Sequence, residues 1–228
     1  MLGKPTDGPV SRYINRRISS RITAFLIRHF ASITPNQLTI LVTIIGIIPS
    51  LLYILRDPIL AAVAGVIVQL DSILDGVDGE FARATGRTSP YGAFLDAILD
   101  RVVDVSILGS IGYALILVMP HLAPALYLLS LAAVTGAVLV SYVHARGEAS
   151  LKTHPGKIGV RCWASRDVRL FLVFLFSLAV PLVGWLSLLA CLAIIAVTSY
   201  AYVFWKLYEM WRMGVGRSGQ ASSNLGRR

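Results

Sequence analysis

Acidic residues are concentrated in one part of this 228-residue chain, where seven of its twelve Asp and Glu residues lie between positions 71 and 104. Six of the seven are aspartates in two groups: Asp71, Asp75 and Asp78, then Asp96, Asp100 and Asp104. Spacings of i, i+4, i+7 and of i, i+4, i+8 place each group on one face of a helix. Carboxylate oxygens with no nearby histidine or cysteine suit Mg²⁺, Mn²⁺ or Ca²⁺ rather than zinc. The pattern predicts a divalent-metal site between two helices.

An inert ion-pair network is the alternative explanation of this cluster. Arg83, Arg87 and Arg101 lie close in sequence and could pair with some of the carboxylates. Three arginines cannot neutralise seven acids, so a bound cation explains the pattern better. For Asp71 and Asp104 the sequence leaves two interpretations open, which are solvation of a helix end and support of the ligands from behind.

The elements that position these aspartates are long apolar helices. Hydrophobic residues make up 56% of the chain and the mean hydropathy is +0.71, which exceeds ordinary globular composition. A helix needs about 20 apolar residues to cross a bilayer, and such stretches fall at 36–55, 59–82, 92–119, 122–144, 166–184 and 186–212. We therefore expect an all-α integral membrane protein with six transmembrane helices. Its second and third spans form an antiparallel hairpin that brings the two acidic faces together.

The chain before the first span predicts an amphipathic interfacial helix. From Ser11 to Phe30, apolar residues recur on one side of a helix and arginines on the other: Ile14, Ile18, Ile22, Phe25 and Leu26 against Arg12, Arg16, Arg17 and Arg21. A disordered basic arm is the alternative. We expect three parts: an N-terminal segment at 1–33, a membrane domain at 34–213 and a flexible tail at 214–228.

The distribution of basic residues predicts the orientation of the chain. The net charge of +9 would suggest nucleic acid in a soluble protein, but most of these basic residues lie in segments on one side of the predicted spans. The positive-inside rule explains this asymmetry and places both termini and the aspartates at the cytoplasmic side of the cell membrane. No nucleic-acid partner is expected.

The acidic hairpin also resembles a known family signature. Residues 75–83 read DGVDGEFAR, and Gly92, Asp96 and Asp100 follow at fixed spacing. This resembles the signature of the CDP-alcohol phosphotransferase family. The resemblance implies transfer of a phosphoalcohol from a CDP-alcohol to an acceptor hydroxyl with release of CMP, a six-helix membrane fold, and usually a homodimer. It also implies that Asp100 is the base that accepts the hydroxyl proton.

Roles for the signature residues follow from their chemistry. One or two Mg²⁺ or Mn²⁺ ions would grip a diphosphate donor, and the predicted ligands are Asp75, Asp78, Asp96 and Asp100. The predicted donor-binding residues are Asn36, Thr39, Asp71, Gly79, Ala82, Arg83 and Gly92. Gly79 and Ala82 leave room for a nucleotide, although close helix packing would also explain them. The segment from Thr34 to Thr39 resembles a family element near the donor, and a plain helix cap is its alternative.

A second polar group is predicted to bind the acceptor. It follows the fourth span and opens the fifth, and its members are Ser141, His144, Arg146, Arg166 and Arg169. Arginines bind phosphate well, so the group suits a phosphorylated polyol; positive-inside topology alone is the alternative. In phosphatidylinositol-phosphate synthases a Ser, Lys and Arg at this spacing receive the acceptor's phosphate, and His144 stands where that pattern has Lys.

The sequence is compatible with three functions. Residues 4–19 and 165–171 resemble the di-myo-inositol phosphate phosphate synthase branch, which joins CDP-inositol to inositol 1-phosphate. A phospholipid synthase that uses CDP-diacylglycerol is the alternative within the family. A membrane ion or metal transporter is the alternative from another class, because intramembrane acids also mark ion paths. Transporters often show internal repeats, and the sequence has no second copy of the acidic hairpin.

Overall fold

The structure is a computed structural model that describes residues 8–30, 32–151 and 162–212. Helices make up nearly all of these residues: η1 (Ser11–Asn15), α1 (Arg16–His29), α2 (Pro35–Ile54), α3 (Pro58–Ala84), α4 (Pro90–Val118), η2 (Pro120–Leu122), α5 (Ala123–Leu151), α6 (Arg166–Val183) and α7 (Leu186–Arg212). The predicted tail at 214–228 and residues 1–7 of the predicted N-terminal segment lie outside the described residues.

The all-α membrane fold is confirmed, with a helix at each of the six predicted spans. Five of these helices, α2, α3, α4, α5 and α7, are long and apolar enough to cross a membrane. The 18-residue α6 is not among them, because Arg166, Asp167 and Arg169 lie in its first turn. One boundary differs from the expectation: α5 continues past residue 144 to Leu151, through the glycine at 147. The chain is a multi-pass membrane protein.

Side-chain caps fix where the helices around the aspartates begin. Thr34 and Gln37 form a reciprocal capping box at the start of α2. The Asp57 carboxylate accepts bonds from two backbone N–H groups of the first turn of α3. Ser89 caps α4 through the N–H of Gly92, at 3.0 Å. The Ser89 cap ends the short 85–89 connection between α3 and α4 and so helps to set the register of the acidic hairpin.

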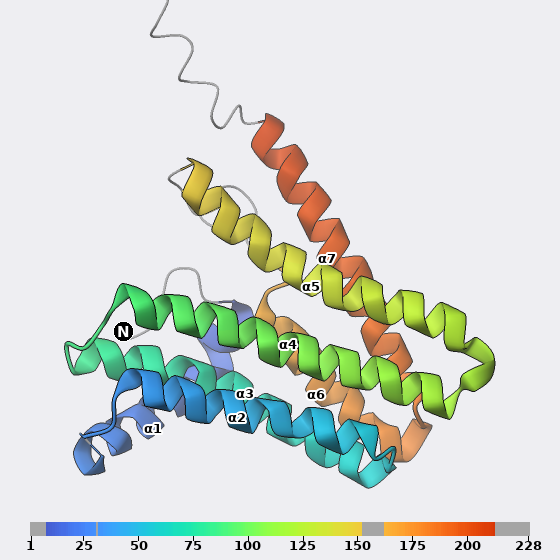
Figure 1. Cartoon of the computed structure of the whole chain (residues 1–228), viewed down its shortest axis with the longest axis horizontal. Coiled ribbons are helices and arrows are strands. Elements are labelled where there is room, and N and C mark those ends of the chain that lie inside the picture. Colours follow the sequence, from blue (N-terminus) through green and yellow to red (C-terminus); the bar gives the residue numbers. More distant parts are fainter. Residues whose placement is uncertain (1–7, 31, 152–161, 213–228) are drawn as a thin grey trace, which may run out of the picture.

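The helix α3 runs beside α2, which partly covers it in Figure 1. It packs mainly against α2 and α6, while α4 packs against α2 and α5, and α5 packs against α7. Gly65 allows α3 and α6 to approach closely, because an added Cβ would lie 2.5 Å from Cβ of Ser177. The Tyr53 hydroxyl of α2 lies 2.7 Å from the same serine's hydroxyl. Small residues and one buried hydrogen bond thus hold three helices together behind the acidic hairpin.

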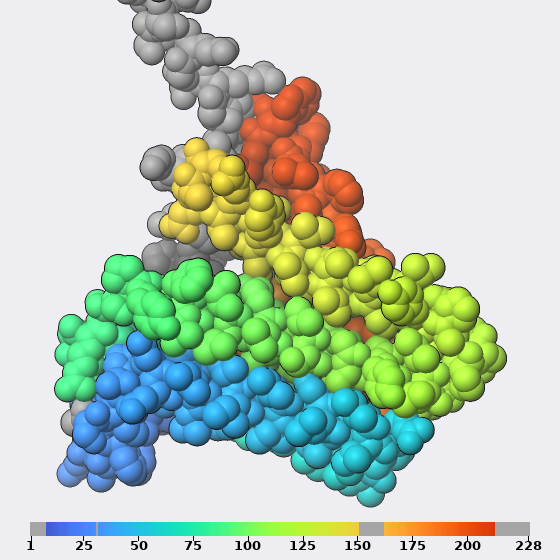
Figure 2. Space-filling model, viewed as in Figure 1, coloured from blue at the N-terminus to red at the C-terminus, as the bar shows by residue number. Residues whose placement is uncertain are grey.

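The elements η1 and α1 follow each other without a break and form the N-terminal helix, which lies at the same end of the molecule as the start of α4 (Figure 2). Its apolar residues Ile14, Ile18 and Phe25 are exposed, as a helix lying in a bilayer interface requires. Its buried row is polar and consists of Asn15, Ser19 and Thr23, which face α3. The helix therefore has three faces, where the sequence pattern predicted an apolar side and a basic side.

Candidate active site

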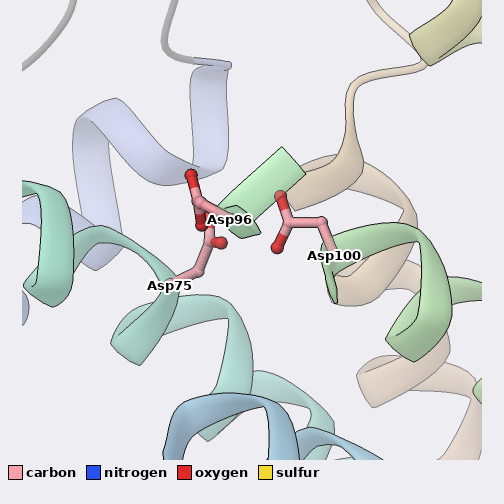
Figure 3. Close-up of side chains that lie close together, drawn as sticks. All are labelled: Asp75, Asp96 and Asp100. Atoms are coloured by element: carbon pink, nitrogen blue, oxygen red, sulfur yellow. The ribbon is translucent and has the colours of Figure 1, made fainter. Parts of the chain in front are cut away.

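Three of the predicted metal ligands converge at the hairpin of α3 and α4. Asp75 of α3 and Asp96 and Asp100 of α4 each offer a carboxylate oxygen, and these oxygens lie within 4.8 Å of one another. Their side chains point toward a common centre (Figure 3). All three are half-buried. We call these residues the aspartate trio.

Asp78, the fourth predicted ligand, stands apart from this group. It is buried and accepts hydrogen bonds from the hydroxyl of Thr39 and the backbone N–H of Gly79. The bond to Thr39 ties the start of α2 to the acidic face of α3. Asp78 therefore connects the trio to the predicted donor-binding residues.

Arg166, in the first turn of α6, pairs with four aspartates at once. Its guanidinium nitrogens lie at 3.0 Å from Asp71, 2.8 Å from Asp75, 3.3 Å from Asp100 and 3.0 Å from Asp104. Two of these partners, Asp75 and Asp100, belong to the trio. Arg166 thus balances part of the negative charge of the trio, whose all-oxygen donor set fits a hard divalent ion.

Asp71 and Asp104 are the most deeply buried carboxylates that pair with Arg166. Both are at most 3% exposed. Asp104 also binds Nη2 of Arg169 at 3.0 Å and lies 3.6 Å from Nε of Arg101. Of the two interpretations left open by the sequence, the structure favours support from behind, because neither residue is at a solvated helix end.

A pocket of about 140 Å³ lies beside the trio at the start of α2 and the α3–α4 turn. We call it the hairpin pocket. Six of the seven predicted donor-binding residues line it: Asn36, Thr39, Gly79, Ala82, Arg83 and Gly92. The seventh, Asp71, lies under the trio beside Arg166 and does not line this pocket. The structure thus brings the predicted donor residues together, with one exception.

A second pocket of about 230 Å³, the central pocket, contains the trio itself. Its lining carries both carboxylates and guanidinium groups: Asp75, Asp78, Asp96 and Asp100, with Arg16, Arg83 and Arg166. The remaining lining residues are small or polar: Gly8, Ser11, Ser72, Gly76, Gly79, Ser165 and Asp167. Phosphate groups with bound metal suit such an alternation of charge.

A third and larger pocket of about 780 Å³, the lateral pocket, opens between α4 and α5. Four of the five predicted acceptor residues line it: Ser141, His144, Arg166 and Arg169. The fifth, Arg146, is exposed and is not among the lining residues. The guanidinium groups of Arg166 and Arg169 are already bound to carboxylates, and Arg169 also donates to the Ala164 carbonyl at 2.6 Å.

Sequence reasoning missed two residues that shape these pockets. The hydroxyl of Tyr202 lies 2.7 Å from Nε2 of His144 and fixes that ring from α7. Arg16 was assigned to the solvated basic side of the N-terminal helix, yet it lines the central pocket and binds Glu80 of α3 at 2.8 Å. The signal for Arg16 was its position beside the polar row Asn15, Ser19 and Thr23, which a purely apolar-versus-basic division of the helix overlooks.

The fold and the site define a membrane-embedded helical bundle with a carboxylate centre, and comparison with known proteins identifies its family. The sequence profile of the CDP-alcohol phosphatidyltransferase family matches residues 32–205. The chain belongs to this family, so the expectation from the aspartate signature is confirmed.

Two curated relatives illustrate the branches of this family. The bifunctional IPC transferase and DIPP synthase of Thermococcus kodakarensis is 41% identical over 183 residues, covering 75% of this chain and 38% of that protein. The archaetidylinositol phosphate synthase of Pyrococcus horikoshii is 33% identical over 178 residues, covering 78% of this chain and 87% of that protein. The chain spans 33–45% of the length of four bifunctional relatives that it matches.

A solved enzyme has the same fold. The phosphatidylinositol phosphate synthase of Mycobacterium tuberculosis with CDP-DAG bound has a TM-score of 0.67 at 25% identity, covering 86% of this chain and 94% of that chain. The same enzyme in complex with manganese and citrate has a TM-score of 0.67 at 24% identity, covering 85% and 88%. At 24% identity, the similarity to the manganese complex shows a common fold only.

Proposed function

We propose that the chain is a metal-dependent CDP-alcohol phosphotransferase, which moves a phosphoalcohol from a CDP-alcohol to an acceptor hydroxyl and releases CMP. One observation carries the proposal: the central pocket, which contains the aspartate trio, shares lining residues with both other pockets. The hairpin and central pockets share Asp78, Gly79, Arg83 and Asp96, while the central and lateral pockets share Gly8, Ser165 and Arg166. A nucleotide, a diphosphate and an acceptor therefore each have a place around one centre.

The hairpin pocket is the proposed site of the cytidine monophosphate part of the donor. Asn36, Thr39, Gly79, Ala82 and Gly92 surround the nucleotide, and Arg83 holds phosphate oxygens by its planar pair of donors. Asp71 contributes indirectly, because it binds Arg166 and does not contact the CDP-alcohol in this proposal.

Mg²⁺, or Mn²⁺, is the proposed cofactor, in one or two ions. Asp75, Asp96 and Asp100 would hold it, with Asp78 as a further ligand from the shared edge of the central and hairpin pockets. When bound, the ion supplies positive charge against the donor's diphosphate. The all-oxygen ligand set supports this choice of metal over zinc.

The proposed chemistry is a single displacement at phosphorus. The acceptor hydroxyl oxygen attacks the β-phosphorus, and the bond from this phosphorus to the bridging oxygen breaks, so that CMP leaves with the bonding electrons. The hydroxyl proton passes to the carboxylate of Asp100, the proposed base. Asp100 is suited to this role because it borders the central pocket and lies 3.3 Å from Arg166, which also lines the lateral pocket.

The lateral pocket is the proposed acceptor site. Ser141, His144, Arg166 and Arg169 would bind a phosphorylated polyol there, with the phosphate drawn by guanidinium groups. Tyr202 orients the His144 ring for this contact. Arg146 remains a predicted contributor from the exposed end of α5.

CDP-inositol and inositol 1-phosphate are the substrates that we favour, with di-myo-inositol phosphate phosphate as product. The DIPP synthase named in Thermococcus kodakarensis supports this choice. A phospholipid synthase that uses CDP-diacylglycerol is the second candidate, supported by the synthases named in Pyrococcus horikoshii and Mycobacterium tuberculosis.

The purified protein tests both candidates. It is incubated with Mg²⁺, inositol 1-phosphate and either CDP-inositol, CDP-glycerol or CDP-diacylglycerol in lipid nanodiscs, and CMP release and product mass are measured. CMP release with CDP-inositol supports the first candidate, and release with CDP-diacylglycerol alone supports the second. No CMP from any donor would overturn the enzyme proposal.

The arrangement of the protein in the cell forms the last part of the proposal. The positive-inside pattern supports a cytoplasmic site and cytoplasmic termini, and the family resemblance supports a homodimer built from the membrane domain at 34–213. Protease accessibility of a C-terminal tag in oriented vesicles tests the orientation, and mass measurement in detergent tests the dimer.

A further inference from the structure

The arrangement of the three pockets leaves one part of the donor without an assigned place. This inference rests on the proposed function, in which CMP occupies the hairpin pocket and the acceptor approaches from the lateral pocket. In phosphoryl transfer the attacking and leaving oxygens lie roughly in line through phosphorus. The donor's own alcohol stays bonded to the β-phosphorus and must project away from that line. Among the residues that the structure describes, seven that line the central pocket line neither of the other two pockets: Ser11, Arg16, Ser72, Asp75, Gly76, Asp100 and Asp167. We call these residues the unshared wall.

Arg16 is the basic group on this wall. Its side chain is 18% exposed, and its Nη1 donates to a carboxylate oxygen of Glu80 at 2.8 Å and to the Gly76 carbonyl at 3.4 Å. An added Cβ at Gly76 would collide with the same Nη1 atom. Gly76 therefore allows the guanidinium to cross α3 and reach the pocket.

Glu80 holds Arg16 in this position. The Glu80 side chain is completely buried, and its two oxygens accept bonds from Ser19 at 2.9 Å and Thr23 at 3.0 Å as well as from Arg16. A buried carboxylate is stable only with such partners. Three consecutive turns of α1 are thus tied to one residue of α3, and this tie fixes where the guanidinium lies.

We propose that Arg16 is a specificity-determining residue, which binds oxygens of the donor's alcohol in the central pocket, and that Glu80 is its positioning residue. A guanidinium has several N–H donors in a fixed plane and no acceptor, so it suits the hydroxyl oxygens of a polyol. Ser11, Ser72 and Asp167 add polar groups to the same wall. The wall therefore favours a hydroxylated alcohol over a hydrocarbon chain.

The test compares donors with and without hydroxyl groups. Arg16→Gln is measured beside Arg17→Gln, which removes the same charge from the next, exposed residue of α1. The donors are CDP-inositol and CDP-propanol, and CMP binding is measured separately. For Arg16→Gln we expect kcat/KM with CDP-inositol to fall about tenfold relative to kcat/KM with CDP-propanol, as for the loss of a hydrogen bond to a charged group, with CMP affinity retained. Arg17→Gln should behave as the wild type.

Two further variants distinguish a specific loss of donor preference from misfolding of the protein. Gly76→Ala keeps both Arg16 and Glu80 but displaces the guanidinium, and Glu80→Gln keeps the shape of the side chain but weakens its hold on Arg16. Both should lower the preference for CDP-inositol over CDP-propanol. An unchanged preference in all three variants, or an equal loss of both donors and of CMP binding, would overturn the proposal. If the wild type itself releases no CMP from any donor, it is the proposed function that fails.

Discussion

Nε of Arg166 lies 3.0 Å from the buried carboxylate of Asp104, which joins the first turn of α6 to the middle of α4. The same guanidinium binds the buried Asp71. Removing it leaves Asp71 without this partner, while Asp104 keeps Arg169 at 3.0 Å. Removing one partner of a buried ion pair costs roughly 3–5 kcal/mol, because the remaining charge stays buried without compensation.

We expect Arg166→Gln to lower the unfolding temperature in detergent markedly, in line with a loss of about 3–5 kcal/mol. The control is Arg21→Gln, which removes an exposed guanidinium from α1. Thermal unfolding followed by tryptophan fluorescence measures the difference. Equal unfolding temperatures for the two variants would show that the network around Arg166 is not a stabilising one.

Asp100→Asn should abolish turnover while donor binding stays measurable. The amide keeps the size of the side chain but cannot accept the acceptor's proton. Asp57→Asn makes the same chemical change at an exposed helix cap at the other end of α3 and should leave turnover unchanged. CMP release and the affinity for a CDP-alcohol are measured in both variants. Retained turnover in Asp100→Asn would exclude this residue as the base.

Ala82→Leu should weaken CMP binding, because the larger side chain fills part of the hairpin pocket. A pocket of about 140 Å³ has little space to spare, and we expect a loss of about tenfold or more, since overpacking typically costs 1–3 kcal/mol. Ala84→Leu adds the same atoms at an exposed position two residues away. Isothermal titration with CMP compares them, and equal affinities would place the nucleotide elsewhere.

Gly65→Ala should destabilise the bundle by about 1–3 kcal/mol, because its Cβ would press on Ser177 of α6. Gly109→Ala is a matched control in α4, where an added Cβ meets nothing within 4 Å. The control should be neutral or slightly stabilising, since alanine favours the helix over glycine. Thermal unfolding of both variants checks the prediction, which an unchanged Gly65→Ala would contradict.

Metal binding should depend on the aspartate trio. Mg²⁺ or Mn²⁺ should raise the unfolding temperature of the wild type, because an ion that binds only the folded state stabilises it. Asp96→Asn should reduce this shift, and a chelator should reverse it. A shift of the same size in Asp96→Asn would place the ion away from the trio.

Much of this architecture could be predicted from the sequence because bilayer-spanning helices have a strong signal. Length and hydropathy located all six helices, and the Thr34-Pro35 pair marked the start of the first. The i, i+4 spacing of the aspartates placed them on facing sides of a hairpin, where the trio converges.

The remaining features depend on how helices far apart in sequence rotate against each other. Arg166 and Arg169 were assigned to an acceptor phosphate by their charge, and the structure also pairs them with carboxylates of α3 and α4. Arg16 was assigned to solvent because periodicity shows the faces of a helix but not which neighbour each face meets. Polar pairing across the bundle, unlike hydrophobic periodicity, leaves no regular pattern in one chain.

The N-terminal helix formed by η1 and α1 presents Ile14, Ile18 and Phe25 outward, and its Ser19 and Thr23 bind Glu80 on the inner side. The apolar residues that face the lipid and the polar residues that bind Glu80 lie on the same short helix. A movement of this helix relative to the bilayer surface would therefore also move Arg16 relative to the trio. On the proposed role of Arg16, we expect the preference among donors to differ between micelles and nanodiscs of different thickness, and an equal preference in both would contradict this coupling.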